Sequence, residues 1–254
     1  KKYKFNLERK DIVYNQNTAI GISKNRNITI SMASADICLI SDDDVNYSEK
    51  YLRQILKAFE ENPEVDIITF KVKTNPSEPE FREYPHFTFC HNIRTIFKVS
   101  SIEIAFRLKN VKQAGIKFDE NFGLGAIFNL GEENIFLMDA LKKGIKIKYS
   151  PYYVVYHPYK RSGILDKFNN EKLISLGALF YRMFGLFCIL FNVFSAFYNY
   201  PEFKSQKSVF KYLALTFKGS WLAYKTINRK KGISLLNLLK LFFKFFKDLK
   251  KERT

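Results

Sequence analysis

The sequence has few cysteines, and their spacing does not suit cross-linking. Cys38, Cys90 and Cys188 are an odd number and include no CxxC pair. This pattern excludes a disulfide framework and a zinc knuckle, and it fits a reducing cytosol. The chain begins with Lys1 and shows no signal peptide. We therefore interpret it as a fragment or a processed chain of a cytoplasmic protein.

A long uninterrupted apolar run is also missing. The most apolar region, residues 174–200, is divided by Arg182 and Asn192. A membrane-spanning helix needs about 20 apolar residues, and an arginine in its middle costs about 3 kcal/mol. We expect buried or interfacial helices here rather than a spanning helix.

Positive charge is abundant but unevenly distributed. The 254 residues carry a formal net charge of +17. Residues 201–254 hold 14 Lys and Arg against 3 Asp and Glu, a net charge of +11, which leaves about +6 for residues 1–200. A basic, aromatic C-terminal part predicts an anionic partner, either nucleic acid or a membrane surface.

The pattern of the tail favours the membrane. Lys240, Lys244, Lys247 and Lys251 recur at steps of four, three and four, so they share one face of a helix whose other faces are rich in Leu and Phe. This pattern is typical of a helix lying in a membrane interface, at the inner face of the cell membrane. The alternative is an apolar face that packs on the domain. We expect no nucleic acid partner, because the apolar face is too broad for a phosphate track.

Strand-like and helix-like segments alternate from Ser23 onward. Helices are predicted over residues 23–32, 49–59 and 132–141, and strands over residues 36–41, 65–70, 102–106, 145–149 and 152–156. Ser23 and Ser48 are the predicted N-caps of the first two helices. The alternation indicates an α/β fold with a largely parallel sheet. We expect this domain over residues 1–165 and a helical, basic amphipathic appendage over residues 166–254.

Three consecutive aspartates, Asp42, Asp43 and Asp44, follow the strand predicted at residues 36–41. Ligands of open α/β sheets bind at the carboxyl ends of strands. Adjacent carboxylates repel one another unless a cation joins them, and Mg²⁺ or Mn²⁺ prefers oxygen ligands and often shares its shell with phosphates. The sequence therefore predicts a divalent metal site; the alternative is a solvated acidic turn before the next helix.

Three segments, taken in order, resemble family-2 glycosyltransferases of the GT-A fold. They are Gly21-Ile22-Ser23-Lys24-Asn25-Arg26-Asn27, then Ser41-Asp42-Asp43-Asp44-Val45, then Phe118-Asp119-Glu120-Asn121-Phe122-Gly123-Leu124-Gly125 followed by Gly131-Glu132-Glu133. The resemblance covers about residues 10–160. It implies a GT-A-like, mostly parallel sheet flanked by helices that lacks the opening βαβ portion of the family.

The resemblance also implies an activity. A member of this family moves a sugar, with inversion, from a nucleotide-sugar donor to an acceptor, here a lipid-linked or surface-polysaccharide precursor. Two alternative functions stay open. One is a catalytically silent, membrane-associated binding subunit of the same fold. The other is a nucleotidyltransferase of a related fold, which the absence of a Gly-rich N-terminal phosphate loop disfavours.

The resemblance assigns donor and metal roles. Asp44 is the expected direct metal ligand, Asp42 contacts the donor ribose or a metal-bound water, and Asp43 does either. Ser23, Arg26 and Asn27 are expected donor-binding residues, and the planar guanidinium of Arg26 suits a diphosphate or a base edge. The alternatives are a helix-surface salt bridge for Arg26 and a loop brace for Asn27.

Four further acidic or imidazole side chains complete the expected site. Glu133 aligns with the family's general base but is Glu rather than Asp, so Glu132 is expected to share the task. The alternative is that both complement a helix N-terminus. His157 is expected to bind metal, or else to be a structural residue at a strand end. Ser100, Ser101 and Glu103 fall where acceptor-binding strands occur in the family.

Overall fold

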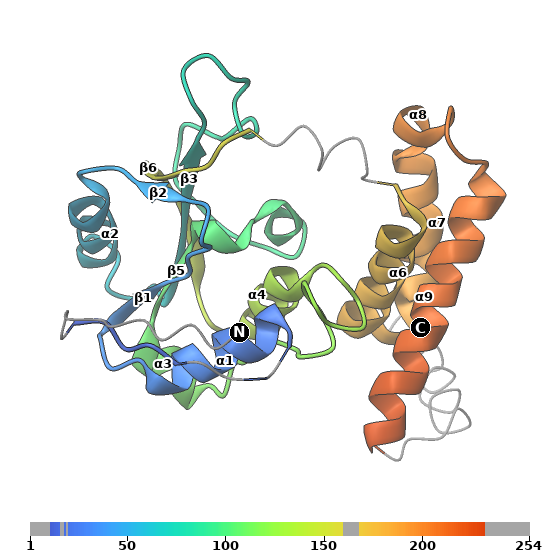
Figure 1. The fold of residues 1–254 in the computed structure, drawn as a ribbon, viewed down its shortest axis with the longest axis horizontal. Coiled ribbons are helices and arrows are strands. Elements are labelled where there is room, and N and C mark those ends of the chain that lie inside the picture. Colours follow the sequence, from blue (N-terminus) through green and yellow to red (C-terminus); the bar gives the residue numbers. More distant parts are fainter. Residues whose placement is uncertain (1–10, 16–17, 19, 160–167, 232–254) are drawn as a thin grey trace, which may run out of the picture.

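The chain forms an α/β part followed by a group of helices (Figure 1). The computed structural model describes residues 11–15, 18, 20–159 and 168–231. The predicted tail helix around Lys240 lies outside the described residues. The boundary predicted between residues 165 and 166 falls in the gap between the two long described segments and stays a prediction.

Six strands form one sheet in the α/β part. They are β1 (Ile37–Leu39), β2 (Asn46–Tyr47), β3 (Ile67–Lys73), β4 (Phe89–Cys90), β5 (Ile104–Arg107) and β6 (Ile147–Tyr156). Their order is β1-β5-β3-β6-β2, with β4 beside β6. The sheet flanked by helices confirms the predicted α/β class.

The prediction of a largely parallel sheet is wrong. Within the described residues only β3 and β6 pair in parallel, and the other four pairings are antiparallel. A parallel crossover is usually made by a helix of a dozen or more residues. Between β3 and β5 the chain instead has a long loop, β4 and two short 3₁₀ turns, η1 (Thr95–Lys98) and η2 (Ser101–Glu103). The chain therefore returns in the opposite direction.

The two strands predicted at residues 145–149 and 152–156 form the single strand β6. Pro151 separates them in the sequence and has no backbone N–H to donate. The β3–β6 pairing shifts register between Thr69, which is opposite Tyr149, and Lys71, which is opposite Tyr153. An irregularity of this kind is where a strand tolerates proline, so the strand continues through it.

Three helices of the α/β part lie close to their predicted positions: α1 (Ile22–Met32), α2 (Tyr51–Glu60) and α4 (Glu132–Lys142). The short helix α3 (Leu108–Gln113) was not predicted. Both predicted serine caps are wrong. The hydroxyl of Ser23 donates to the Phe122 carbonyl at 2.6 Å, and that of Ser48 donates to the Tyr153 carbonyl at 3.4 Å. Distant carbonyls, rather than the first turns of the helices, take up these hydroxyls.

Apolar side chains of β3 point alternately to two cores. Ile67 belongs to the core that also contains Phe136 of α4, whereas Ile68 belongs to the core that contains Phe59 of α2. Because both faces of β3 are covered, its first six residues are all buried. This packing fixes the ends of the strands at which the candidate site lies.

The C-terminal helices are α6 (Asn170–Phe184), η3 (Gly185–Phe187), α7 (Cys188–Tyr198), α8 (Tyr200–Phe203) and α9 (Val209–Lys231). Helices α6 and α9 cross closely at two glycines. A Cβ atom on Gly177 would lie 1.8 Å from the Thr216 carbonyl oxygen, and one on Gly219 would lie 1.8 Å from the Ile174 carbonyl oxygen. The sequence can bring the two backbones together only because these residues lack a side chain.

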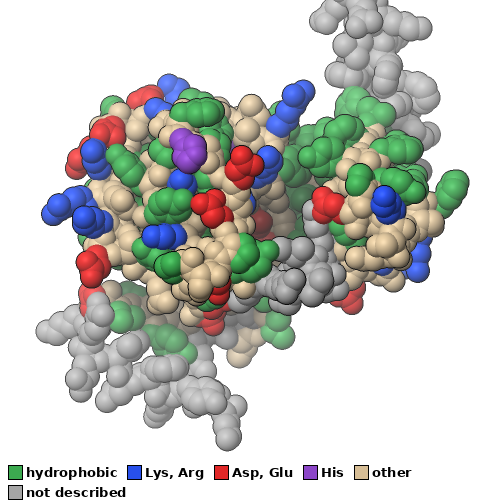
Figure 2. Space-filling model, turned by 90° about the horizontal axis from the view of Figure 1, so that it is seen from above, with side chains coloured by type: hydrophobic (Ala, Val, Ile, Leu, Met, Phe, Trp, Pro, Cys, Tyr) green, Lys and Arg blue, Asp and Glu red, His purple; other side chains and the backbone are tan. Residues whose placement is uncertain are grey.

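Helices α6 and α7 cover the apolar region considered for a membrane span. By length and composition alone, Asn170–Tyr198 could cross a membrane, and half of its most apolar window is buried inside the structure. Most of α6 is buried, whereas α7 exposes much of its length. Figure 2 shows hydrophobic side chains gathered over this helical part, at the right of the view.

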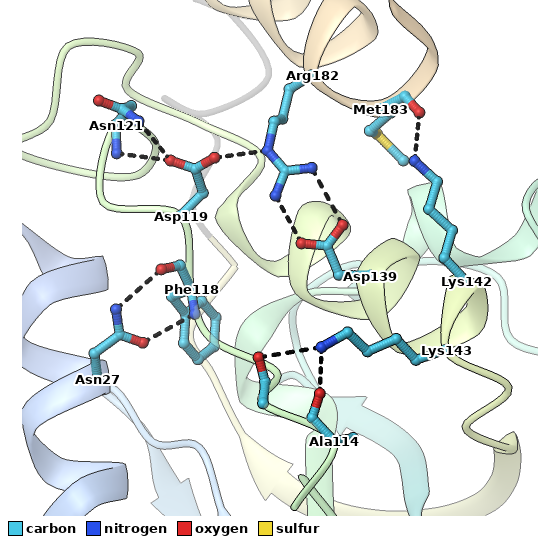
Figure 3. Close-up of polar contacts among 11 residues, drawn as sticks. Asn27, Ala114, Phe118, Asp119, Asn121, Asp139, Lys142, Lys143, Arg182 and Met183 are labelled. Atoms are coloured by element: carbon cyan, nitrogen blue, oxygen red, sulfur yellow. Dashed lines mark hydrogen bonds and ion pairs between the residues drawn. The ribbon is translucent and has the colours of Figure 1, made fainter. Parts of the chain in front are cut away.

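Arg182 of α6 joins the helices to the α/β part (Figure 3). Its Nε donates to Asp119 Oδ2 at 2.7 Å, and its two terminal nitrogens donate to Asp139 at 3.2 and 2.7 Å. Lys142 of α4 donates to the Met183 carbonyl at 2.7 Å. The arginine that counted against a membrane span therefore holds α6 against α4 and against the loop that begins at Phe118.

Candidate active site

Arg26 lies at the centre of the candidate site. Its Nη1 donates to Glu132 Oε1 at 2.9 Å, and its Nη2 donates to Asp42 Oδ1 at 2.9 Å and to the Ser101 hydroxyl at 3.0 Å. The guanidinium also lies 5.4 Å from the centre of the Phe118 ring. One side chain on α1 therefore connects the first, second and third motifs. The alternative of a helix-surface salt bridge is wrong, because Arg26 is buried.

Asn27 and Ser23 brace the loop of the third motif. The Asn27 amide donates to the Phe118 carbonyl and accepts from the Phe118 N–H, both at 2.9 Å (Figure 3). Ser23 is buried and holds the Phe122 carbonyl. The structure places both polar groups against the backbone of this loop, which is the alternative that the sequence left open for Asn27.

Asp43 and Asp44 follow Asp42 in the loop before β2 and are exposed. Asp44 Oδ1 lies 3.6 Å from Nε2 of His157, which follows β6 directly. The Nδ1 atom of His157 donates to the Pro158 carbonyl at 2.7 Å, because a carbonyl can only accept. Nε2 is therefore the ring nitrogen that faces the Asp44 carboxylate. The structure thus brings together Asp44 and His157, two residues that are far apart in the sequence.

A cation fits this arrangement only with further ligands. Among the described residues, no group of three or more His, Cys, Asp and Glu side chains forms a metal-binding cluster. A carboxylate oxygen and an imidazole nitrogen are both side-chain groups that bind divalent metals. Two protein ligands suit an ion such as Mg²⁺, which keeps several waters and binds substrate phosphates.

The paired glutamates lie in different environments at the start of α4. Glu132 is buried and bound to Arg26, whereas Glu133 is half-buried and close enough to Glu132 to share a hydrogen bond. Loss of water around Glu133, and next the charge of Glu132, raise the pKa of Glu133 well above the usual range of a carboxyl group. Both lie in the first turn of α4, where the helix dipole stabilises negatively charged side chains.

Glu103 is not available to an acceptor, which corrects its expected role. Its side chain is fully buried, where one oxygen accepts from the Tyr84 hydroxyl and the other pairs with Arg82. It also accepts from the Ser100 N–H at 3.2 Å. Burial raises the pKa of Glu103 to about 7, and Arg82 opposes this shift. Sequence reasoning missed Arg82 and Tyr84, for which the only signal was the length of their loop.

Two cavities adjoin the candidate residues. One of about 270 Å³ lies between α1 and β1 and is lined by Arg26, Leu39 and Phe118 among others. A second of about 190 Å³ lies at the carboxyl end of β3 and is lined by charged and aromatic side chains, including Lys73 and Arg82. The ring of Phe81, which also lines the second cavity, is 5.8 Å from that of His157. Space for ligands therefore exists beside both Arg26 and His157.

Comparison with known proteins agrees with this picture. Residues 1–121 match the family described as "Glycosyl transferase family 2". The solved structure of residues 1–349 of S. aureus TarS is 14% identical, with a TM-score of 0.50, and the similarity covers 79% of this chain and 71% of that one. The same fragment in complex with UDP-GlcNAc also gives 14% identity and a TM-score of 0.50, covering 79% and 72% of the two chains.

A longer structure of S. aureus TarS is similar at 14% identity and a TM-score of 0.50, with 77% of this chain and 42% of that chain covered. No curated protein matches the sequence. At 14% identity, the solved structures show only that the fold is shared. The family match, in contrast, is a match of the amino-acid sequence. Residues 1–121 are thus similar in sequence to glycosyl transferase family 2, and the solved structures share the fold.

Proposed function

We propose that the chain is an inverting, metal-dependent glycosyltransferase that moves a sugar from a nucleotide-sugar donor to a lipid-linked or surface-polysaccharide precursor. The proposal rests mainly on two salt bridges, which Arg26 forms with Asp42 and with Glu132. They hold the acidic motif after β1 next to the acidic pair that begins α4. A donor-side carboxylate, Asp42, and the neighbour of the proposed base, Glu132, therefore lie on two sides of one guanidinium.

In this proposal Arg26 positions Asp42, and Asp42 orients the donor. Arg26 is buried and already holds two carboxylates and a hydroxyl. Ser23 and Asn27 support the donor side indirectly, since they fix the loop of the third motif. The cavity between α1 and β1 is the space that we assign to the nucleotide.

Asp44 and His157 would hold the divalent ion, with donor phosphates and water as the remaining ligands. Such an ion, when bound, neutralises the negative charge of the diphosphate leaving group. Asp43 is exposed beside them, and we assign it no contact with the ion. Mn²⁺ or Mg²⁺ is the cofactor expected from this donor set.

Glu133 acts as the general base. The acceptor hydroxyl forms a bond to the anomeric carbon, the bond from that carbon to the diphosphate breaks, and the hydroxyl proton passes to Glu133. Attack from the side opposite the leaving group inverts the anomeric configuration. Glu132 is engaged by Arg26, whereas Glu133 is not paired with it, and the raised pKa of Glu133 makes its carboxylate a stronger base than an ordinary glutamate.

The identity of the donor is tested by binding. Calorimetric titration of nucleoside diphosphates with and without Mn²⁺ should show binding that depends on the metal. UDP comes first in the panel, because TarS has been solved with UDP-GlcNAc. Asp44→Asn should weaken the metal-dependent binding at least about tenfold, since one of two protein ligands loses its charge.

Asp43→Asn is the matched control, because it removes the same charge one residue away. The proposal predicts that this variant keeps the binding of the wild type. Equal loss in both variants would show that charge in the loop, rather than ligation by Asp44, is what matters. Metal-independent binding of equal strength in all three proteins would overturn the metal site.

A further inference from the structure

The outer face of α7 is apolar and open to solvent. Leu190, Phe194 and Phe197 are 65%, 65% and 66% exposed, and they recur at steps of four and three, so they lie along one side of the helix. The opposite side, with Cys188 and Asn192, is buried. Helix α7 has no charged residue. One face of α7 is therefore as apolar as a protein core, but no described residue packs over it.

Helix α9 presents a similar stripe. Phe210, Ala214, Phe217 and Trp221 recur at steps of four, three and four on one side of the helix and are all exposed. The other side, which includes Tyr212 and Thr216, is buried. Large exposed apolar surfaces mark sites that bind proteins or membranes. The stripe on α9 therefore belongs with the face of α7 as a candidate docking surface.

Helices α7 and α9 are in contact through their buried sides, and both stripes lie on sides of the two helices that stay exposed. The Asn192 side chain donates to the Ser220 hydroxyl at 2.9 Å, and the Tyr212 hydroxyl donates to the Ser195 hydroxyl at 3.3 Å. We call the exposed apolar residues of both helices the α7–α9 face. Its members are Ile189, Leu190, Val193, Phe194, Phe197, Tyr198, Phe210, Phe217, Trp221 and Leu222.

Lysines flank this face. Lys211, Lys218 and Lys225 recur at steps of seven, which places them along one side of the α9 stripe, and all three are exposed. From the start of α7 to Ile227, the chain carries five lysines and a single acid, Glu202. An apolar surface with aromatic residues and a row of lysines is complementary to an anionic bilayer, which offers acyl chains beneath negative headgroups.

We propose that the α7–α9 face docks the chain onto an anionic lipid bilayer. The inference deepens the proposed function, on which it rests, since it would bring the site of transfer to a lipid-borne acceptor. Trp221 and Tyr198 suit the headgroup level, and Phe194 and Phe197 suit the acyl boundary below it. Arg182, which ties α6 to α4, makes the docked helices and the site move together.

Charge argues against two other covers for this face. A second copy would bring a second row of lysines against the first, and like charges repel. Residues 232–254 carry six Lys and Arg against two acids, so this tail would also bring positive charge toward the lysines. A surface of negative headgroups attracts the face and the tail alike.

Trp221 provides a direct probe, because it is the only tryptophan of the chain. The full chain is titrated with vesicles of phosphatidylcholine alone and with added phosphatidylglycerol, and its emission is followed. The proposal predicts a blue shift with the anionic vesicles and quenching by brominated acyl chains. Binding through the tail alone would leave Trp221 in water, so sedimentation with the vesicles without a blue shift would overturn the proposal.

Two sets of variants sharpen this test. Phe194→Ser combined with Phe197→Ser should weaken partition into anionic vesicles at least about tenfold, since two large apolar side chains leave the contact. Phe87→Ser combined with Ile93→Ser is the matched control in the α/β part, where the two side chains are 69% and 49% exposed. The control pair should bind vesicles as the wild type does.

Outcomes that contradict the proposal are distinct from those that contradict the proposed function. Wild-type vesicle binding by the Phe194/Phe197 pair would overturn the face. A wild-type dimer that becomes a monomer in this pair, with vesicle binding unchanged, would assign the face to a second copy. Mn²⁺-dependent nucleotide binding is measured on the same proteins. A wild-type protein that binds no nucleotide would count against the proposed donor site. The vesicle assay would still test whether the α7–α9 face binds the bilayer.

Discussion

The α/β part and the C-terminal helices differ in the interactions that hold them together. In the α/β part, arginines hold carboxylates in place: the buried Arg26 holds Asp42 and Glu132, and the partly buried Arg82 holds Glu103. In the helical part, α6 and α9 pack through backbone contact at glycines, and the outer surfaces stay apolar. The first arrangement fixes charges for chemistry. The second offers an apolar surface, and the ion pairs of Arg182 join it to the α/β part.

The junction between the two parts explains how they can act together. Arg182 binds Asp119 in the loop braced by Asn27, and it binds Asp139 on the helix that begins with the paired glutamates (Figure 3). A charged pair that is partly buried loses more when one partner is removed than an exposed pair does. The comparison therefore predicts that changes in one part leave the other intact unless they reach this junction.

The largest effect should follow from removing the base in the α/β part. Glu133→Gln should lower kcat/KM for donor turnover by about 10² to 10⁴, the usual contribution of a general base. The measurement is release of nucleoside diphosphate from the donor. Vesicle binding should be unchanged, which separates the two parts of the molecule.

The pH profile sharpens this prediction. A base works when it is deprotonated, so activity should rise with pH through the raised pKa of Glu133. Glu132→Gln removes the neighbouring charge that raises this pKa, so the acidic limb should move to lower pH. An active Glu133→Gln protein beside an inactive Glu132→Gln protein would instead make Glu132 the base.

The next effect tests the helical part. Gly177→Ala places a methyl group where the Thr216 carbonyl lies 1.8 Å away. Overpacking of this kind should lower the free energy of unfolding by about 3 kcal/mol, more than the gain of about 1 kcal/mol from the better helix former. Urea denaturation measures the change, and loss of the Trp221 blue shift with vesicles is expected alongside it.

Gly144→Ala is the control, since a Cβ atom there meets nothing within 4 Å. Its backbone has a φ of 77°, so a cost of about 1 kcal/mol is expected from conformation alone. Equal costs at Gly177 and Gly144 would mean that α6 and α9 do not cross as closely as described.

The smallest effect concerns the buried carboxyl of Glu103. Its pKa is raised to about 7 by burial, so the folded state favours the protonated form. The stabilisation is fully present below the ordinary carboxyl pKa and is lost as the pH rises through about 7, up to about 3 kcal/mol in total. The free energy of unfolding of the wild type should therefore fall more steeply between about pH 5 and pH 8 than that of Glu103→Gln.

Parallel pH dependences in the two proteins would show that the ion pair with Arg82 balances the burial of Glu103. Glu78→Gln serves as the reference, because the pKa of this exposed carboxyl shifts downward, owing first to the hydrogen bond from the Tyr159 N–H. Its removal should not flatten the profile above pH 5.

Sequence reasoning located three helices and most of the longer strands of the α/β part. The spacing of apolar residues predicted α1, α2 and α4 nearly to their ends, because helical periodicity is local. It did not predict the direction of β5 or the hydrogen bonds of Ser23 and Ser48, because these depend on partners far along the chain. Arg82 and Tyr84 were missed for the same reason, since nothing near them in the sequence points to Glu103.

The sequence by itself determined the α/β class, the family motifs and the basic, apolar character of the C-terminal part, because composition and short-range spacing carry this information. Only the tertiary structure decided that Arg26 meets Glu132 across 106 positions, that Arg182 closes the junction, and which face of α7 stays open. Such contacts are chosen by packing and burial over the whole fold, which no local pattern specifies.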